Sequence, residues 1–310
     1  MWWQSLLDEV GSSEKCLWEP PDGASNTGGQ AFHGLGLEEV VKEIDHCIAA
    51  VTETSRASRI GMIGSTSYTF PSKVFREHGI SGVRKLTLDA ATALAGANNF
   101  GTLVIGHTIA GPQGDFALSF RKSKIPVVHV LPSCYSASRD LRLILYDHDG
   151  NRRDKGEEEH WHVVICGENW TERNRILASL AAQYCVIGGG PGTLMEVNEA
   201  RQQNAGILPV IGSGGLVEGL TFQGKGLKGL EENLGDVPPP GVDIFSWRCM
   251  LNPKADSMSF EAYRDIVQAV FASVVESTSS IPTNVWPLSR AEGMEHSAHA
   301  SSEDAREAFS

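Results

Sequence analysis

The chain has 310 residues, of which 41% are hydrophobic and 21% are charged, proportions that are ordinary for a folded globular protein. Its formal net charge of -12 argues against nonspecific binding to nucleic acid or to an anionic membrane surface, because both require a positive field. The longest apolar runs are far shorter than the roughly 20 residues that span a bilayer, and residues 1–9 lack a signal-peptide pattern, so we expect a cytoplasmic protein.

Apolar residues at helical spacing alternate with short apolar runs along most of the chain. The helical spacing predicts helices at residues 37–52, 86–97, 114–123, 173–182, 192–204 and 260–275. The short runs predict strands at residues 59–64, 101–106, 125–131, 141–146, 161–166, 184–187 and 207–211. This alternation is typical of an α/β protein, so we expect a Rossmann-like three-layer sandwich with a mostly parallel central sheet.

The same pattern divides the chain into four parts. Residues 1–55 are expected to form an N-terminal arm and a helix that packs on the core, and residues 56–213 a Rossmann-like nucleotide-binding core. Residues 214–278 are a Gly/Pro-rich extension, mostly loop between 216 and 257, that ends in a closing helix. Residues 279–310 are polar and are expected to be disordered.

Six cysteines are scattered along the chain without a Cys-x-x-Cys pair. Reduced thiols are therefore expected, and a structural zinc site, which needs closely spaced pairs, is not. Cys134 with His107 is an alternative nucleophile and base, although a lone cysteine after a strand is more often structural. We expect neither a metal nor another cofactor.

An acidic, turn-rich segment contains Asp147, Asp149 and Asn151, whose spacing resembles that of a calcium loop. Such a loop needs a glycine at its sixth position, where this sequence has Arg152, so we do not expect a metal there. His160 and His162 would share one face of a strand. Without a third ligand nearby, they are expected to pack in the sheet or to lie at its edge.

The strand at residues 59–64 ends in a hydroxyl-rich turn. In an open α/β sheet the first strand-to-helix turn lies at the carboxyl edge, where ligands bind. Gly64 and Ser65, followed by Thr66 and Ser67, are therefore candidate nucleotide contacts. Small hydroxyl residues are also common turn formers and helix caps, and this alternative stays open.

The most informative stretch is the apolar run at residues 184–187, which passes into GGGPGT and then into a strong helix pattern. Glycines let the backbone approach a ligand, and the first turn of a helix leaves N–H groups unpaired where the helix dipole favours an anion. A phosphate is the expected guest at this junction.

Two charged residues accompany the glycine turn. Glu196 lies three residues after Thr193, so both side chains point to the side of the turn. A carboxylate there can stabilise an oxocarbenium-like centre or activate a water, as carboxylates do in glycoside hydrolysis. Arg173, on the preceding helix, can hold a phosphate or a carboxylate in two hydrogen bonds. The alternative is that Glu196 only complements the helix dipole and that Arg173 is a surface residue.

The stretch GGGPGTLME at residues 188–196 and the segment TERN at residues 171–174 carry a resemblance to a known family. With Gly188 in place of a proline, they match the PGGxGTxxE motif and its upstream arginine in the Lonely guy family. These phosphoribohydrolases release free cytokinin bases from nucleoside 5′-monophosphates. GHTIAGPQG at residues 106–114 is similar to the family's upstream GGGxxGLMG turn. The resemblance covers roughly residues 59–213.

The upstream turn departs from the family pattern at four positions. His107 and Thr108 stand where the family has two glycines, and Pro112 and Gln113 stand where it has leucine and methionine. These changes alter the part of the turn that lies near the base or ribose in the family.

The resemblance implies hydrolysis of the N-glycosidic bond of a purine or N6-modified purine nucleoside 5′-monophosphate, giving free base and ribose 5-phosphate. Glu196 would be the catalytic carboxylate and Arg173 its partner. The 5′-phosphate would be held by Gly189, Gly190, Gly192 and Thr193. Besides Gly64 and Ser65, secondary nucleotide contacts would be Gly106, His107, Thr108, Gly111, Gly114 and Glu199. Glu199 is alternatively a solvated helix residue. Family members are generally homodimers with shared sites, so a homodimer is implied.

Two other functions remain open. The same fold occurs in modules that bind a phosphorylated ligand without turning it over, and the substituted upstream turn favours such a nucleotide-sensing or carrier role. A dinucleotide-dependent oxidoreductase is a weaker alternative, because the glycine turn follows a late strand and no first-strand GxGxxG with its acidic ribose partner is present. Relatives labelled lysine decarboxylases exist, but no lysine here lies in a recognisable pyridoxal phosphate motif.

Overall fold

The structure is a computed structural model of the chain, and it describes residues 16–18, 36–97, 99–106, 111–132, 161–167, 170–222, 225–227, 230, 237–253 and 258–274. All of these residues belong to one unit that covers Met1–Ser280. The predictions for residues 133–160, which include the strand at 141–146, Cys134, Asp147, Asp149, Asn151 and His160, lie outside the described residues, as does the tail at 279–310. Among the described residues, no helix has both the length and the apolar character of a membrane span.

A seven-stranded parallel sheet forms the centre of the described part of the chain, with the strands in the order β1-β5-β4-β3-β2-β6-β7. The strands are β1 (Cys16–Trp18), β2 (Arg59–Gly64), β3 (Thr102–Ile105), β4 (Val127–Leu131), β5 (Trp161–Ile165), β6 (Gln183–Ile187) and β7 (Gly206–Pro209). A separate antiparallel hairpin is formed by β8 (Leu220–Phe222) and β9 (Lys225–Leu227). The predicted α/β fold with a mostly parallel sheet is confirmed.

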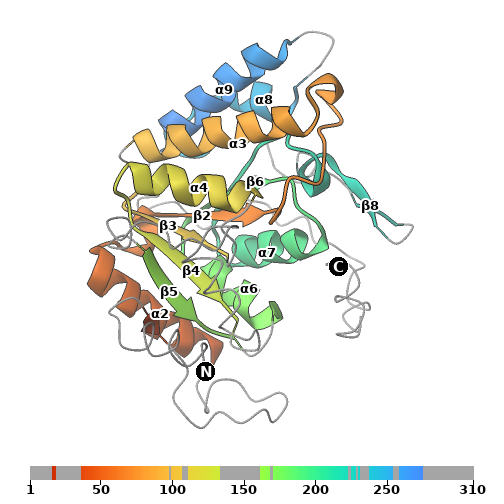
Figure 1. The fold of residues 1–310 in the computed structure, drawn as a ribbon. Coiled ribbons are helices and arrows are strands. Elements are labelled where there is room, and N and C mark those ends of the chain that lie inside the picture. The colour runs from red at the N-terminus through yellow and green to blue at the C-terminus, as the bar shows by residue number, and fades with distance from the viewer. Residues whose placement is uncertain are drawn as a thin grey trace, which may run out of the picture. The chain divides into compact units, whose positions relative to one another are not determined.

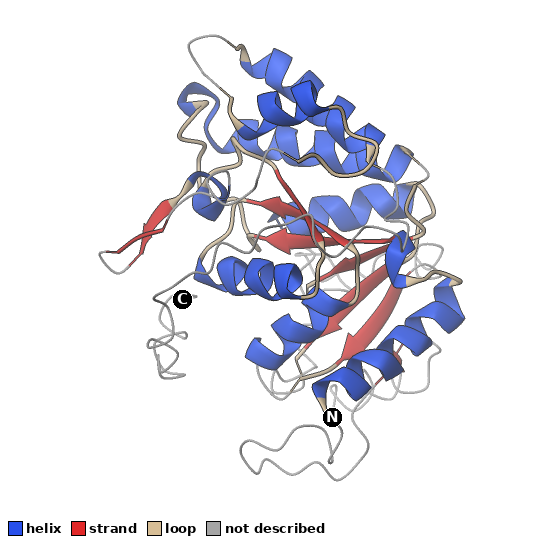
Figure 2. Ribbon diagram, turned by 180° about the vertical axis from the view of Figure 1, so that it is seen from behind, coloured by secondary structure: helices blue, strands red, loops and turns tan. Residues whose placement is uncertain are grey.

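Helices cover both faces of this sheet. One group consists of α3 (Gly79–Gly96), α4 (Gly111–Lys122), α8 (Ile244–Leu251) and α9 (Phe260–Ser273). The other group consists of α2 (Leu37–Thr52), α6 (Trp170–Ser179) and α7 (Pro191–Gln202). The strands lie between the two groups in both views (Figures 1 and 2). This is the three-layer arrangement that the alternating sequence predicts.

The predicted helix at residues 37–52 shows how the local pattern becomes packing. Val40, Ile44 and Ile48 repeat at a spacing of four, which places them on one helix face, and all three are fully buried. Glu39 caps the start of α2 by accepting a hydrogen bond from the Gly36 N–H (3.1 Å). The buried face of α2 packs with α6 against the sheet.

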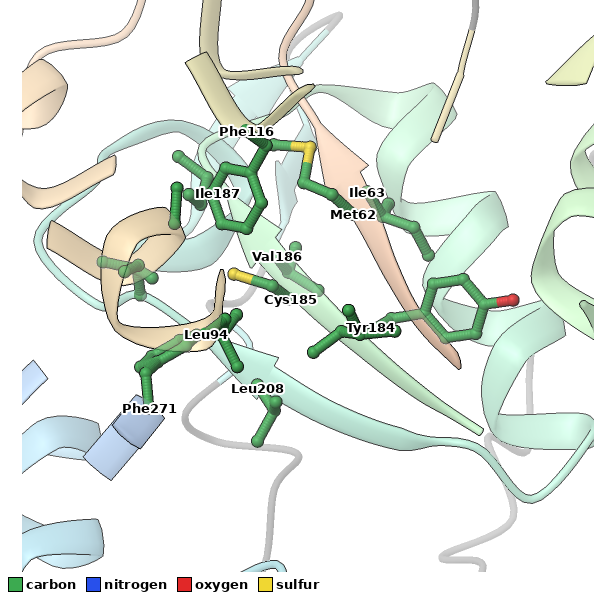
Figure 3. Close-up of a cluster of buried hydrophobic side chains, with 14 of the residues drawn as sticks. Met62, Ile63, Leu94, Phe116, Tyr184, Cys185, Val186, Ile187, Leu208 and Phe271 are labelled. Carbon is green, nitrogen blue, oxygen red and sulfur yellow. The ribbon is translucent and has the colours of Figure 1, made fainter. Parts of the chain in front are cut away.

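Strand β6 alternates its side chains between the two layers, as the period of two requires. Figure 3 shows Cys185 directed toward Leu94 of α3 and Phe116 of α4, whereas Tyr184 points the opposite way, on the side of Ile63. These residues are fully buried. Because both faces of β6 are covered, its residues 184–187 form a continuous apolar run rather than an alternating one.

The largest departures from the predicted elements concern the start of one helix and a segment predicted to be mostly loop. Helix α3 begins at Gly79 rather than at residue 86. The sequence pattern misses its first turns because they contain glycines, which are poor helix formers. Gly82 is one of these: a Cβ there would lie 3.3 Å from the Phe260 ring of α9. The region 216–257, predicted to be mostly loop, contains α8. Asp243 caps α8 by accepting from the Ser246 N–H (2.9 Å).

Gly61 of β2 leaves room for the Tyr184 ring on the neighbouring strand β6, and a Cβ built at Gly61 overlaps that ring. The ring cannot move aside freely, because the Tyr184 hydroxyl accepts from the Ala181 N–H (3.0 Å) and donates to the Leu177 carbonyl. We expect Gly61→Ala to lower the free energy of unfolding by about 1–3 kcal/mol, measured by urea denaturation.

Gly96→Ala is the matched control for this prediction. A Cβ at Gly96, in the last turn of α3, meets no atom within 4 Å, so alanine should leave stability unchanged or raise it by up to about 1 kcal/mol. Equal stability of the Gly61→Ala and Gly96→Ala proteins would contradict the steric explanation.

Candidate functional site

The candidate site lies at the carboxyl edge of the sheet, where β3, β2 and β6 run side by side. The strand order changes direction here: β3, β4 and β5 follow one another on one side of β2, whereas β6 and β7 lie on the other side. Open α/β sheets bind ligands in the crevice at such a switch point. Gly64, Gly106 and Gly188 stand at the ends of these three strands.

The glycine turn after β6 is held by hydroxyl groups from two other loops. Gly188 and Gly189 have φ values of 59° and 92°, in the left-handed region that favours glycine. The Gly188 N–H donates to Ser213 Oγ (2.8 Å), and the Gly189 N–H donates to Ser65 Oγ (2.7 Å). The Gly189 N–H, expected to bind the phosphate, is thus used inside the protein in this structure. The Ser65 hydroxyl connects the turns that follow β2 and β6.

The start of α7 is open. The N-cap is Gly190, which has no side chain to accept a hydrogen bond from the helix. Pro191 occupies the first helical position. The N–H groups of Gly192 and Thr193 have no acceptor within the helix, because they precede its first complete turn. A Cβ built at Gly190 or Gly192 meets no atom within 4 Å. Open space beside unpaired N–H groups and a positive dipole end is suited to an anion.

Beside this helix start, the structure brings Arg173 of α6 and Glu196 of α7 together. Arg173 Nη1 donates to Glu196 Oε1 at 2.6 Å, and both side chains are buried. The interpretation of Arg173 as a surface residue is therefore wrong. Within the described residues, the hydrogen bonds of the Glu196 carboxylate use Oε1 only, so Oε2 is left for a ligand or a water.

Burial and the neighbouring Arg173 together set the pKa of the Glu196 carboxyl. Burial raises the pKa of the Glu196 carboxyl above its ordinary value, and the charge and hydrogen bond of Arg173 partly offset this rise. A carboxylate with a raised pKa takes up a proton closer to neutral pH than an exposed glutamate does. The site therefore combines a fixed cation with a carboxylate that is more basic than usual.

Arg173 is positioned by its neighbour Asn174 and by groups outside the motif segments. Its Nε donates to the Val130 carbonyl (3.0 Å), and its Nη1 also donates to Asn174 Oδ1 (2.8 Å). The Trp170 ring lies one helical turn earlier, with the guanidinium carbon 5.4 Å from the ring centroid. Gly167 (φ 80°) lets the backbone before α6 lie close to Arg173, since a Cβ at Gly167 would lie 2.5 Å from the backbone nitrogen of Arg173. These contacts fix the guanidinium in one orientation.

Gly106 and Gln113, from the two ends of the upstream turn, lie beside the Arg173 guanidinium. Gly106 follows β3, and a Cβ there would overlap Arg173 Nη2 and lie 2.8 Å from Gln113 Oε1. Gly111 (φ 60°) is the first residue of α4 and lies close to the loop after β2. A Cβ there would lie 2.6 Å from the Thr66 carbonyl oxygen. Gly114 is buried in the first turn of α4. His107 and Thr108 lie outside the described residues.

Glu199 is positioned differently from Glu196. It lies one turn further along α7 and pairs with Arg175 of α6 at 3.2 Å, where the Arg175 side chain is 48% exposed. This ion pair connects α6 and α7, and the Glu199 side chain is itself 22% exposed. Within the described residues, no group of three or more His, Cys, Asp or Glu side chains is arranged to hold a metal ion.

Comparison with known proteins names no family for this chain. No family model matches the chain, and no curated protein matches it. Among solved structures, the chain is similar to the X-ray structure of TM1055, a target of the Northeast Structural Genomics Consortium. The two share 18% identity with a TM-score of 0.35, over 54% of this chain and 84% of that chain. The site is therefore interpreted from its own geometry.

Proposed function

We propose that this protein hydrolyses the N-glycosidic bond of a purine nucleoside 5′-monophosphate, with or without an N6 substituent, to the free base and ribose 5-phosphate. The observation that carries the proposal is the buried Arg173–Glu196 pair beside the open start of α7. The resemblance of residues 171–196 to the Lonely guy phosphoribohydrolases supports the same reaction.

The phosphate would bind at the start of α7. The N–H groups of Gly192 and Thr193 and the Thr193 hydroxyl are the donors, and Gly190 leaves space for the phosphate oxygens. This placement holds the nucleotide by its 5′ end and turns the rest of it toward Glu196. A nucleoside without phosphate would lose these contacts.

Glu196 would act at the anomeric carbon. As the bond between C1′ and the base nitrogen breaks, its electrons remain on the base, which takes up a proton, and positive charge develops on the sugar. The Glu196 carboxylate stabilises that charge, and Oε2 accepts the proton of the water that attacks C1′. Glu196 then releases this proton to solvent, which replaces the proton that the base takes from solvent as it leaves. Arg173 keeps Oε1 fixed through its hydrogen bond (2.6 Å), so the carboxylate presents the same oxygen to every substrate. One nucleotide and one water give one base and one ribose 5-phosphate.

Gly106→Ala tests whether the position of Arg173 matters for this reaction. The added methyl group overlaps Arg173 Nη2 and approaches Gln113 Oε1, so it displaces the guanidinium from Glu196. We expect base release to fall by about 10- to 100-fold, because misplacing a catalytic group has effects of this size. The measurement is kcat/KM with AMP, together with the far-UV circular dichroism spectrum to check the fold. Gly96→Ala, far from the site, should keep the activity of the unchanged protein.

The proposal is tested by incubating the protein with AMP and with N6-modified AMP and resolving the products by chromatography. Release of base from either nucleotide is the expected result. If the nucleotides raise the melting temperature but stay intact, the protein is a nucleotide-binding module of the same fold, and hydrolysis is excluded as its reaction. A site filled at 100 times its Kd should gain about 2.7 kcal/mol in stability.

A further inference from the structure

Gln113 carries an unused hydrogen-bond acceptor at the site. The residue lies in the first turn of α4 and is only 4% exposed. Its Nε2 donates to the Gly64 carbonyl over a long 3.4 Å, and its Oε1 has no hydrogen-bond partner within the part of the chain that the structure describes. Buried side-chain oxygens are nearly always paired, so this one points to a partner that the folded chain itself does not supply.

The unpaired oxygen lies next to a hydrogen-bond donor. Gly106, which has no side chain, is flanked by both groups: a Cβ there would have Arg173 Nη2 and Gln113 Oε1 as its two nearest atoms. Among the described residues, Arg173 makes its hydrogen bonds through Nε and Nη1. The Nη2 donor and the Oε1 acceptor thus converge at the end of β3.

A hydroxyl group is the chemistry that fits a donor and an acceptor side by side. It can donate to Gln113 Oε1 and accept from Arg173 Nη2 at the same time, whereas an amine or a carbonyl satisfies only one of them. The same guanidinium holds Glu196 through Nη1, so the hydroxyl would lie close to the carbon on which Glu196 acts.

We propose that Gln113 is a specificity-determining residue that accepts a hydrogen bond from the ribose 2′-hydroxyl of the substrate. The 2′-hydroxyl is on the carbon next to the anomeric carbon, and in glycoside hydrolysis hydrogen bonds to the neighbouring hydroxyl strengthen in the transition state. The inference rests on the proposed function, because it takes Glu196 to lie at the anomeric carbon. It makes the site selective for ribonucleotides over 2′-deoxyribonucleotides.

The test compares AMP with 2′-deoxy-AMP on the unchanged protein and on Gln113→Met, which keeps the length and volume of the side chain but removes the acceptor. Gln113→Leu is a second variant in case the first does not fold, and Gln203→Leu is the control, because Gln203 is exposed at the far end of α7. Dissociation constants are measured by titration calorimetry in a Glu196→Gln background, which suppresses turnover. Values of kcat/KM are measured with Glu196 present.

With Gln113 present, AMP should be preferred over 2′-deoxy-AMP by on the order of 10- to 100-fold, since a buried group left unpaired by the wrong ligand discriminates strongly. In Gln113→Met and Gln113→Leu this ratio should approach one, and in Gln203→Leu it should not change. A ratio that stays the same without Gln113, or no preference in the unchanged protein, overturns the inference. AMP that binds with a Gln113-dependent preference but is not cleaved overturns only the proposed function. A protein that binds neither nucleotide overturns both.

Discussion

Glu196→Gln should abolish most base release from AMP while leaving AMP binding nearly intact. The amide is the same size as the carboxylate and its oxygen can still accept the Arg173 hydrogen bond, but it neither stabilises a positive sugar nor takes a proton from water. General base catalysis and charge stabilisation of this kind are worth about 10²- to 10⁴-fold, so we expect kcat to fall by that factor. The measurement is single-turnover release of adenine, with AMP affinity from titration calorimetry.

Glu43→Gln is the matched control for this substitution. Glu43 is an exposed glutamate on α2, so the same chemical change there should leave both kcat and affinity unaltered. Unchanged base release by Glu196→Gln would remove Glu196 from the mechanism, whatever its contact with Arg173.

Arg173→Met should destabilise the protein by about 3–5 kcal/mol, because it leaves the Glu196 carboxylate buried without its cation. The loss should depend on pH. With Arg173 gone, burial alone sets the Glu196 pKa, which rises further above its ordinary value. A carboxyl whose folded pKa exceeds its unfolded pKa destabilises the fold progressively as the pH rises from the unfolded to the folded value. The deficit of Arg173→Met should therefore be smallest below about pH 4.3, the ordinary glutamate pKa, and larger at pH 7.

Urea unfolding at pH 4 and pH 7 measures this difference. The double variant Arg173→Met/Glu196→Gln supplies the second half of a double-mutant cycle and should recover part of the stability at pH 7, because no charge is then left buried. A deficit that is equal at both pH values, with no recovery in the double variant, would show that Arg173 contributes packing rather than charge.

The sheet and most helices were predictable because their signals are local. Buried parallel strands are continuous apolar runs, and β6 is an example whose two faces are both covered. The parts that failed depend on tertiary contacts. Gly79 and Gly82 disfavour a helix by propensity, yet α3 includes both, since Gly82 packs against Phe260. The short helix α8 lies in a segment rich in glycine and proline, which predicts loop. The N-cap at Asp243 is too weak a signal to predict a helix there.

The charged pair of the site could be expected from spacing, but its environment could not. Residue type and separation predict that Arg173 and Glu196 lie near the glycine turn. Their burial, and the hydrogen bond from Arg173 Nη1 to Glu196 Oε1, follow from how α6 and α7 pack. The hydrogen bond between Ser65 and Gly189 joins residues 124 positions apart, and no local pattern in the sequence signals it. In the sequence, Gln113 is only a departure from the family motif. Its role as a candidate ligand contact follows from the structure, in which its buried Oε1 has no hydrogen-bond partner within the described residues.

The proposed hydrolysis is tested most directly by measuring the products formed from AMP and from adenosine under the same conditions. We expect equal amounts of adenine and ribose 5-phosphate from AMP and little release from adenosine, because only the monophosphate can use the start of α7. Intact AMP after prolonged incubation with folded protein, or equal cleavage of the two substrates, would contradict the proposal that a phosphate held at Gly192 and Thr193 directs the sugar to Glu196.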